Sequence, residues 1–225
     1  MNKNFFRITG VANIVSAVCL LLFWFLYAVL LPISVVSTNY DLLILDPDWL
    51  FVNGLGVIGF VLAVVGILGI FFKQFNDLTL LGMFGFLITV VGLVLYNAGM
   101  YYETFIWPIL AEFDDNLVTL STGPIYSNPV FFIMQILSGS IYAIGFLIFG
   151  ISTYKTKSFS KWAILLLVIG VVLFIPGFFP YEVRTVGIIA YAIGLIWVGY
   201  LLIKQRPTKE EDKGKEEKQK EEKQE

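Results

Sequence analysis

Charged residues divide the chain into six long stretches that carry no charge. Each stretch has room for the roughly 20 apolar residues with which an α-helix crosses about 30 Å of hydrocarbon. The pattern therefore predicts an all-α membrane protein built as a six-transmembrane-helix bundle. The expected helices cover about Thr9–Leu31, Trp49–Phe72, Leu78–Met100, Val130–Tyr154, Lys161–Phe179 and the run between Arg184 and Lys204.

The composition of the 225 residues agrees with this pattern. Hydrophobic residues make up 58% of the chain and the mean hydropathy is +0.82, which lies outside the balance typical of soluble domains. Residues 1–205 are predicted to form one six-helix membrane domain with no room for a soluble catalytic domain. Residues 206–225 are mostly Lys, Glu and Gln with no apolar stripe to bury, so they are predicted to form a charged, disordered cytoplasmic tail.

Basic residues collect on one side of the predicted bundle. They lie before the first helix, in the second and fourth connections and after the sixth helix: Lys3, Arg7, Lys73, Lys155, Lys157, Lys161 and the basic residues from Lys204 onward. Cytoplasmic connections retain Lys and Arg, so both termini are predicted to be cytoplasmic. Arg184 alone falls on the opposite side, among the acidic residues Asp41, Asp46, Asp48, Glu103, Glu112, Asp114, Asp115 and Glu182.

Small residues form stripes on the expected helices. The second and third helices use the same spacing i, i+3, i+7, i+10, with Gly56, Gly59, Ala63 and Gly66 on one and Gly82, Gly85, Thr89 and Gly92 on the other. Small residues let the backbones of two membrane helices approach closely. We therefore expect these two stripes to face each other as the seam of a tight hairpin.

The later helices carry small residues seven positions apart, a spacing that favours left-handed crossings in a compact bundle. These residues are Ser138, Gly145 and Ser152, then Ala163, Gly170 and Gly177, then Gly187 and Gly194. The second, fourth and sixth helices also share an ending, a glycine about one turn before a lysine: Gly69 and Lys73, Gly150 and Lys155, Gly199 and Lys204. Either an internal duplication or a shared membrane composition can explain this similarity.

Several kinds of chemistry lack the residues that they need. The chain has no histidine, its one cysteine is Cys19 inside the first helix, and no charged residue stands in the middle of an expected span. These features argue against metal sites, intramembrane proteases and proton pumps. The sequence has neither a glycine-rich loop that could hold phosphates nor a large basic surface, so nothing in it suggests nucleotide or nucleic-acid binding. We expect no enzyme activity, no cofactor and no nucleic-acid partner.

Polar residues gather toward the predicted outer ends of three helices. Asn53, Asn97, Glu103, Gln135 and Ser138 make up this group, and Glu103 continues the stripe of the third helix. Two interpretations stay open, since the five side chains can line an outward-facing ligand pocket or form hydrogen bonds between helices. Phe178, Phe179 and Tyr181 beside Arg184 either cover such a pocket or belong to an aromatic belt.

Four phrases of the chain resemble those of a loose group of small uncharacterised bacterial multi-spanning membrane proteins. They are Arg7–Ala12, Gly66–Phe71, Glu103–Ala111 and Lys161–Ala163. The resemblance implies a multi-pass protein of a bacterial-type plasma membrane and brings no activity with it. Six helices with both ends inside are also similar to the membrane-embedded substrate-binding subunits of vitamin uptake systems.

These observations support two main hypotheses about function. In the first, the protein is a non-enzymatic integral membrane protein that acts through helix or partner contacts, with the lipid bilayer and a membrane protein as its partners. In the second, it is a carrier or substrate-capture subunit for a small uncharged or cationic ligand held at the five polar residues. A third hypothesis, an enzyme acting on lipid head groups, lacks the histidine or paired carboxylates that such chemistry normally uses.

Overall fold

The computed structural model describes residues 3–31, 40–118, 123–125, 127–174 and 179–204, and this part of the chain is helical without strands. The predicted tail 206–225 lies outside the described residues, as do Gly177 and Phe178. Five helical segments are long and apolar enough to cross a membrane: Lys3–Leu30, Trp49–Lys73, Leu80–Phe113, Ile133–Thr156 and Tyr181–Ile203.

The expected helices are found close to their predicted bounds. The long helices are α1 (Lys3–Leu30), α3 (Trp49–Lys73), α4 (Leu80–Phe105), α6 (Pro129–Thr156) and α8 (Tyr181–Ile203). The fifth expected span begins at the predicted residue as α7 (Lys161–Phe174), but its described part has only 14 residues and is shorter than the other five. Short helices occupy two connections: α2 (Tyr40–Ile44), α5 (Trp107–Phe113) and the 3-10 helix η2 (Asp115–Val118).

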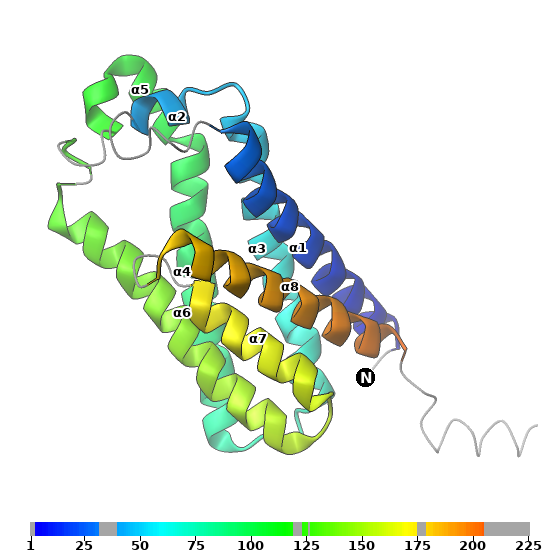
Figure 1. Cartoon of the computed structure of the whole chain (residues 1–225). Coiled ribbons are helices and arrows are strands. Elements are labelled where there is room, and N and C mark those ends of the chain that lie inside the picture. Colours follow the sequence, from blue (N-terminus) through cyan, green and yellow to red (C-terminus); the bar gives the residue numbers. More distant parts are fainter. Residues whose placement is uncertain (1–2, 32–39, 119–122, 126, 175–178, 205–225) are drawn as a thin grey trace, which may run out of the picture.

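The six longer helices are arranged as three antiparallel hairpins, α1 with α3, α4 with α6 and α7 with α8 (Figure 1). The most extensive helix contacts lie within these hairpins and between α1 and α8. Smaller contacts join α3 to α4 and α6 to α7. Each helix therefore contacts its neighbour in the chain, and α8 returns to α1 to close a ring.

The glycine stripe of α3 faces α1 instead of α4. A side chain at Gly59 would meet Leu20 at 2.8 Å, and one at Gly66 would meet Asn13. Hydrogen bonds follow the same contact, because the Ser16 hydroxyl donates to the carbonyl of Gly59 at 2.7 Å. Toward the start of α3, Gly56 lies against both Phe23 of α1 and Met100 of α4. The expectation that the stripes of α3 and α4 form one seam is therefore wrong.

The stripe of α4 packs against α6. A Cβ atom at Gly85 would lie 2.7 Å from the backbone nitrogen of Phe149. Gly92 lies against Tyr142 in the same way, while Gly145 of α6 lies against Thr89 of α4. Ser152 contacts Gly82. The stripes that the sequence places on α4 and α6 thus meet each other, and Ala63, with no exposed surface, belongs to the separate contact between α3 and α1.

The third hairpin uses the same arrangement. Gly170 of α7 lies against Tyr191 of α8. A Cβ atom added to Gly194 of α8 would lie 2.7 Å from the side chain of Leu167 of α7. The hairpin then joins α1 through Gly10 and Gly199, each of which is close to the other's carbonyl oxygen. Only glycine leaves room for backbones at this separation.

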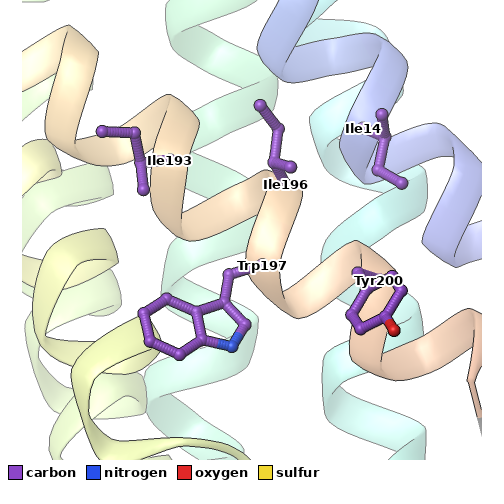
Figure 2. A pocket seen from close by; sticks show the side chains of 5 residues that line it. All are labelled: Ile14, Ile193, Ile196, Trp197 and Tyr200. Carbon is purple, nitrogen blue, oxygen red and sulfur yellow. The ribbon is translucent and has the colours of Figure 1, made fainter.

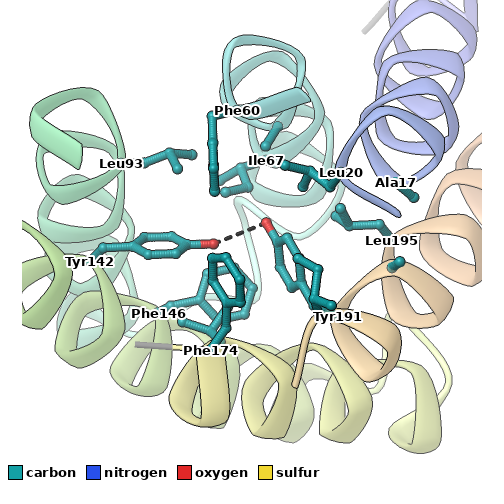
Figure 3. Packing of buried hydrophobic residues seen from close by; sticks show 14 of the residues in the cluster. Ala17, Leu20, Phe60, Ile67, Leu93, Tyr142, Phe146, Phe174, Tyr191 and Leu195 are labelled. Atoms are coloured by element: carbon teal, nitrogen blue, oxygen red, sulfur yellow. Dashed lines mark hydrogen bonds between the residues drawn. The ribbon is translucent and has the colours of Figure 1, made fainter. Parts of the chain in front are cut away.

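Apolar side chains from all six longer helices fill the centre of the ring (Figure 3). They include Phe60, Leu93, Phe146 and Leu195, none of which is more than 2% exposed. Within this core, the hydroxyl groups of Tyr142 and Tyr191 form a hydrogen bond. The middle of the bundle is therefore a packed apolar core that contains a bonded pair of tyrosines.

The two ends of the bundle differ in charge, and in the described part of the chain short helices lie over only one of them. The start of α1 and the end of α8 lie at one end (Figure 1), where the basic residues Arg7, Lys73 and Lys204 are found. At the other end, α2, α5 and η2 contact one another and bury a small apolar cluster of Leu43, Ile44, Trp107, Ala111 and Val118. The connection between α4 and α6 therefore contains the short helices α5 and η2.

Candidate functional site

Arg184 is the basic residue that the sequence placed on the acidic side, and its guanidinium lies on aromatic rings inside the bundle. The guanidinium carbon is 5.0 Å from the centre of the Trp24 ring and 5.6 Å from that of Phe174. Both rings are buried, at 7% and 6% exposure. Because Trp24 belongs to α1 and Phe174 to α7, the side chain extends from α8 into the junction of three helices.

The aromatic bed under Arg184 is fixed by further contacts. Tyr181 stacks on the Trp24 ring at 4.8 Å with an interplanar angle of 12°. The Trp24 indole N–H donates to the Thr185 hydroxyl at 2.8 Å, and Thr185 donates to the carbonyl of Tyr181. These contacts hold the indole face in place. Stacking of a guanidinium on such a face is favourable and leaves its outer N–H groups available for other partners.

Two buried polar atoms, one of them in this guanidinium group, lack a partner. Arg184 Nε and Asn97 Oδ1 are both inaccessible and have no hydrogen-bond partner among the described residues. A buried polar atom without a partner is uncommon in a native protein and requires an explanation, such as an ordered ligand or water.

Glu103 lies on the last turn of α4, as the stripe of that helix predicted, and is half-buried. The last turn of α4 and the first turn of α8, which carries Arg184, belong to the same end of the bundle. Both signs of charge therefore occur at this end.

Asn53 lies at the same level as Glu103. Phe60 packs on Tyr96 with ring centres 5.0 Å apart, and Gly56 contacts Met100, so the antiparallel register of α3 and α4 brings Asn53 opposite Glu103. However, the Asn53 amide donates to the carbonyl of Trp49 in its own helix, at 3.0 Å. This hydrogen bond serves α3 and does not link helices.

The two polar residues on α6 are less closely tied to this group. Ser138 donates to the carbonyl of Gln135 at 2.9 Å, again within one helix. The contact of α6 with α4 is tight at Gly92 but absent at Gly99, which has no atom within 4 Å of an added side chain. The structure thus places Asn53, Asn97 and Glu103 toward the same end of α3 and α4. Asn53 and Ser138 are each bonded within their own helix, and Gln135 lies on the part of α6 where the contact with α4 has ended.

The sequence placed Tyr181 beside Arg184, either as the cover of a pocket or as part of an aromatic belt, and it marked Arg184 as the exception to the charge bias. Trp24, Tyr27 and Phe174 gave no signal, because aromatic residues are common in apolar helices and their neighbours depend on the closure of α8 onto α1.

The arrangement has the properties of a binding site for an anionic group. A guanidinium forms paired, charge-assisted hydrogen bonds with carboxylates and phosphates, and the carbonyl oxygen of Asn97 can accept a hydrogen bond from a ligand. The described residues include no cluster of three His, Cys, Asp or Glu side chains able to hold a metal ion. The groups present suit recognition.

Comparison of the chain with protein-family models, with curated proteins and with solved structures gave no match in any of the three. The resemblance to small bacterial multi-spanning proteins therefore stays a prediction.

Proposed function

We propose that this chain is a non-enzymatic, multi-pass protein of a bacterial-type plasma membrane that captures a small solute at its outer end. It crosses the bilayer six times, with α7 as the fifth span and with both termini in the cytoplasm. The solute carries a carboxylate or a phosphate group, which pairs with Arg184. The observation that carries this proposal is the buried, unpaired Nε atom of Arg184 on its bed of Trp24 and Phe174.

The helix contacts also support capture over a role based on partner contacts. The small-residue stripes suggested a surface for other membrane proteins, but Gly59, Gly85, Gly92, Gly170 and Gly194 all lie against helices of the same chain. The stripes thus stabilise the fold itself and give no argument for an external partner. The sequence suggested an uncharged or cationic solute at the five polar residues. An anionic solute fits Arg184 better, because its guanidinium lies on the buried aromatic rings of Trp24 and Phe174.

Binding can be tested with the purified full-length protein in a mild detergent. Inorganic phosphate and succinate serve as probes of the two anionic groups, and the readout is intrinsic tryptophan fluorescence, since Arg184 lies 5.0 Å from Trp24. We expect a saturable response to at least one probe, and a loss of affinity of about tenfold or more in Arg184→Gln, because a charged hydrogen bond is removed.

The matched control is Arg7→Gln, which removes an exposed arginine at the other end of the bundle and should leave the response unchanged. Mass spectrometry of small molecules released from the wild type and from Arg184→Gln identifies a solute that is retained through purification. A wild-type protein that responds to neither anion and carries no such molecule would contradict the proposed capture.

The topology has its own test in intact cells, using single cysteines in a Cys19→Ser background and a membrane-impermeant maleimide. Glu112→Cys on α5 and Glu182→Cys at the start of α8 should be labelled from outside, while Lys157→Cys between α6 and α7 should not. All three positions are exposed. Labelling of Lys157→Cys together with Glu182→Cys would mean that α7 does not cross the bilayer.

A further inference from the structure

A second candidate site lies on the outside of the bundle, at the opposite end from Arg184. It is a groove of about 470 Å³ between α1 and α8. Ile14 of α1 forms one wall, and Ile193, Ile196, Trp197 and Tyr200 of α8 form the other (Figure 2). The α8 residues are 37% to 50% exposed, so the groove opens on the outer surface of the ring.

The groove leads to basic side chains. Lys204 lies one turn beyond Tyr200, and its ammonium is 5.4 Å from the centre of the Tyr200 ring. On the other wall, Arg7 lies seven residues before Ile14 and therefore on the same face of α1. Arg7 is exposed. Since α1 and α8 are antiparallel with Gly10 opposite Gly199, Arg7 and Lys204 belong to the same end of the groove.

The length of this feature matches one leaflet of a bilayer. Ile193 and Lys204 are eleven residues apart, which corresponds to about 16 Å along a helix at about 1.5 Å per residue. Half of a hydrocarbon core of about 30 Å is about 15 Å. A lipid with its phosphate at the basic end would therefore lay its acyl chain along the whole groove.

We propose that the groove between α1 and α8 binds one anionic phospholipid, whose phosphate pairs with Lys204 and Arg7 and whose acyl chain lies on Ile196 and Trp197. Apolar walls and a cationic end together match the two parts of such a lipid. This site is separate from the solute site at Arg184, and it uses residues of α8 that do not take part in the core.

A second copy of the chain and unspecific bilayer lipid are the alternative occupants of the groove, and each would bind it in a different way. A second copy of the chain would have to bring acidic residues to Lys204 and Arg7, whereas the acidic residues of the described part lie mainly at the opposite end of the bundle. Unspecific bilayer lipid would show no preference for an anionic head group. Head-group selectivity at this groove therefore distinguishes the proposed lipid from both.

The experiment is native mass spectrometry of the full-length protein released from nanodiscs of phosphatidylglycerol or phosphatidylcholine with identical acyl chains. We expect the wild type to retain one phosphatidylglycerol and to lose phosphatidylcholine. Lys204→Gln and Arg7→Gln should each weaken retention about fivefold, the effect of one cation near an anionic membrane surface. Ile196→Trp fills the groove and should weaken retention of phosphatidylglycerol about tenfold, the loss expected when about two methylene groups leave it.

Matched controls come from α6 at the same end and on the same kind of surface. Lys155→Gln removes an exposed lysine, and Ile144→Trp enlarges a side chain that is 57% exposed. Neither should change retention. Equal retention of both lipids by the wild type would overturn the proposal, as would equal retention by Ile196→Trp and Ile144→Trp. The exposed Lys204→Gln keeps the test decisive if Ile196→Trp fails to fold.

Discussion

The hydroxyl groups of Tyr142 on α6 and Tyr191 on α8 lie 2.9 Å apart and are hydrogen-bonded in the middle of an apolar core. Phe146 packs edge-on against both rings, and both tyrosines are at most 5% exposed. The pair therefore connects the second hairpin to the third at a point that water does not reach.

This pair predicts a specific pattern of coupling. Tyr142→Phe and Tyr191→Phe should each lower the free energy of unfolding by about 1 kcal/mol, because each leaves the other hydroxyl buried without its partner. The double variant should lose less than the sum of the two, since neither hydroxyl then remains. Equilibrium unfolding in lipid bicelles measures these differences. Tyr154→Phe, at a tyrosine that is 42% exposed, is the control, and strictly additive losses would contradict the coupling.

Two glycines seven residues apart on α4 should respond in opposite ways to the same substitution. An added methyl group at Gly92 meets the backbone of Tyr142, whereas one at Gly99 meets no atom within 4 Å. Gly92→Ala should destabilise the protein by about 1 to 3 kcal/mol through overpacking. Gly99→Ala should be neutral or stabilise it by up to about 1 kcal/mol, because alanine favours the helix. Thermal unfolding of the two variants in one detergent provides the comparison, and equal effects would remove the argument for backbone contact.

The aromatic bed of Arg184 makes Trp24 a positioning residue for the captured anion. Trp24→Leu keeps an apolar side chain but removes the ring face and the hydrogen bond to Thr185. We expect the affinity for phosphate or succinate to fall about threefold to thirtyfold, the range of a cation–π contact. Titration calorimetry is the suitable measurement, since the variant loses a fluorescent reporter. Trp162→Leu, at a residue that is 68% exposed, should bind as the wild type does.

Lys157 ends α6 in the left-handed region, with φ 59° and ψ 14°. A residue with a Cβ atom is strained there, and glycine is not. Lys157→Gly should therefore raise the free energy of unfolding by about 0.5 to 1 kcal/mol. Lys155→Gly, two residues earlier inside the helix, should lower it by a similar amount. A lower stability for Lys157→Gly would show that the lysine side chain contributes more than the backbone strain takes away.

The sequence was sufficient to predict where the long helices lie. The charged residues around them define the uncharged runs, and α3 begins at Trp49 as predicted. It was also sufficient to find the small residues that bring helices together, including Gly85 and Gly145. It did not identify the partner helix of each stripe, because the stripes share similar spacings and any two of the helices could be paired through them.

The physical reason for the wrong pairing lies in the shape of a glycine surface. Both bulky and small residues can cover a glycine, since Leu20 covers Gly59 whereas Gly10 and Gly199 lie against each other. The residue type therefore does not identify the partner helix. The α1 face of Asn13, Ser16 and Leu20 supplies both bulk and hydrogen-bond donors. For the candidate site, the sequence placed Tyr181 beside Arg184, and a ligand-binding role of Asn97 and Glu103 stays a prediction. The aromatic bed of Arg184 depends on the contact of α8 with α1, which joins distant parts of the chain and leaves no local signal.

Each hairpin contains its own glycine contact, and both joins between hairpins lie at one end of the bundle. The polypeptide can therefore be divided in the turn near Asn76, or near Ser158, without separating any helix from its principal partner. Two separately translated fragments, 1–76 and 77–225, would each keep complete hairpins and should reassemble when produced together. A fragment boundary near Asp114 would instead split α4 from α6. The fold is therefore built from three helix hairpins, each of which keeps its main packing contact when the turn to the next hairpin is cut.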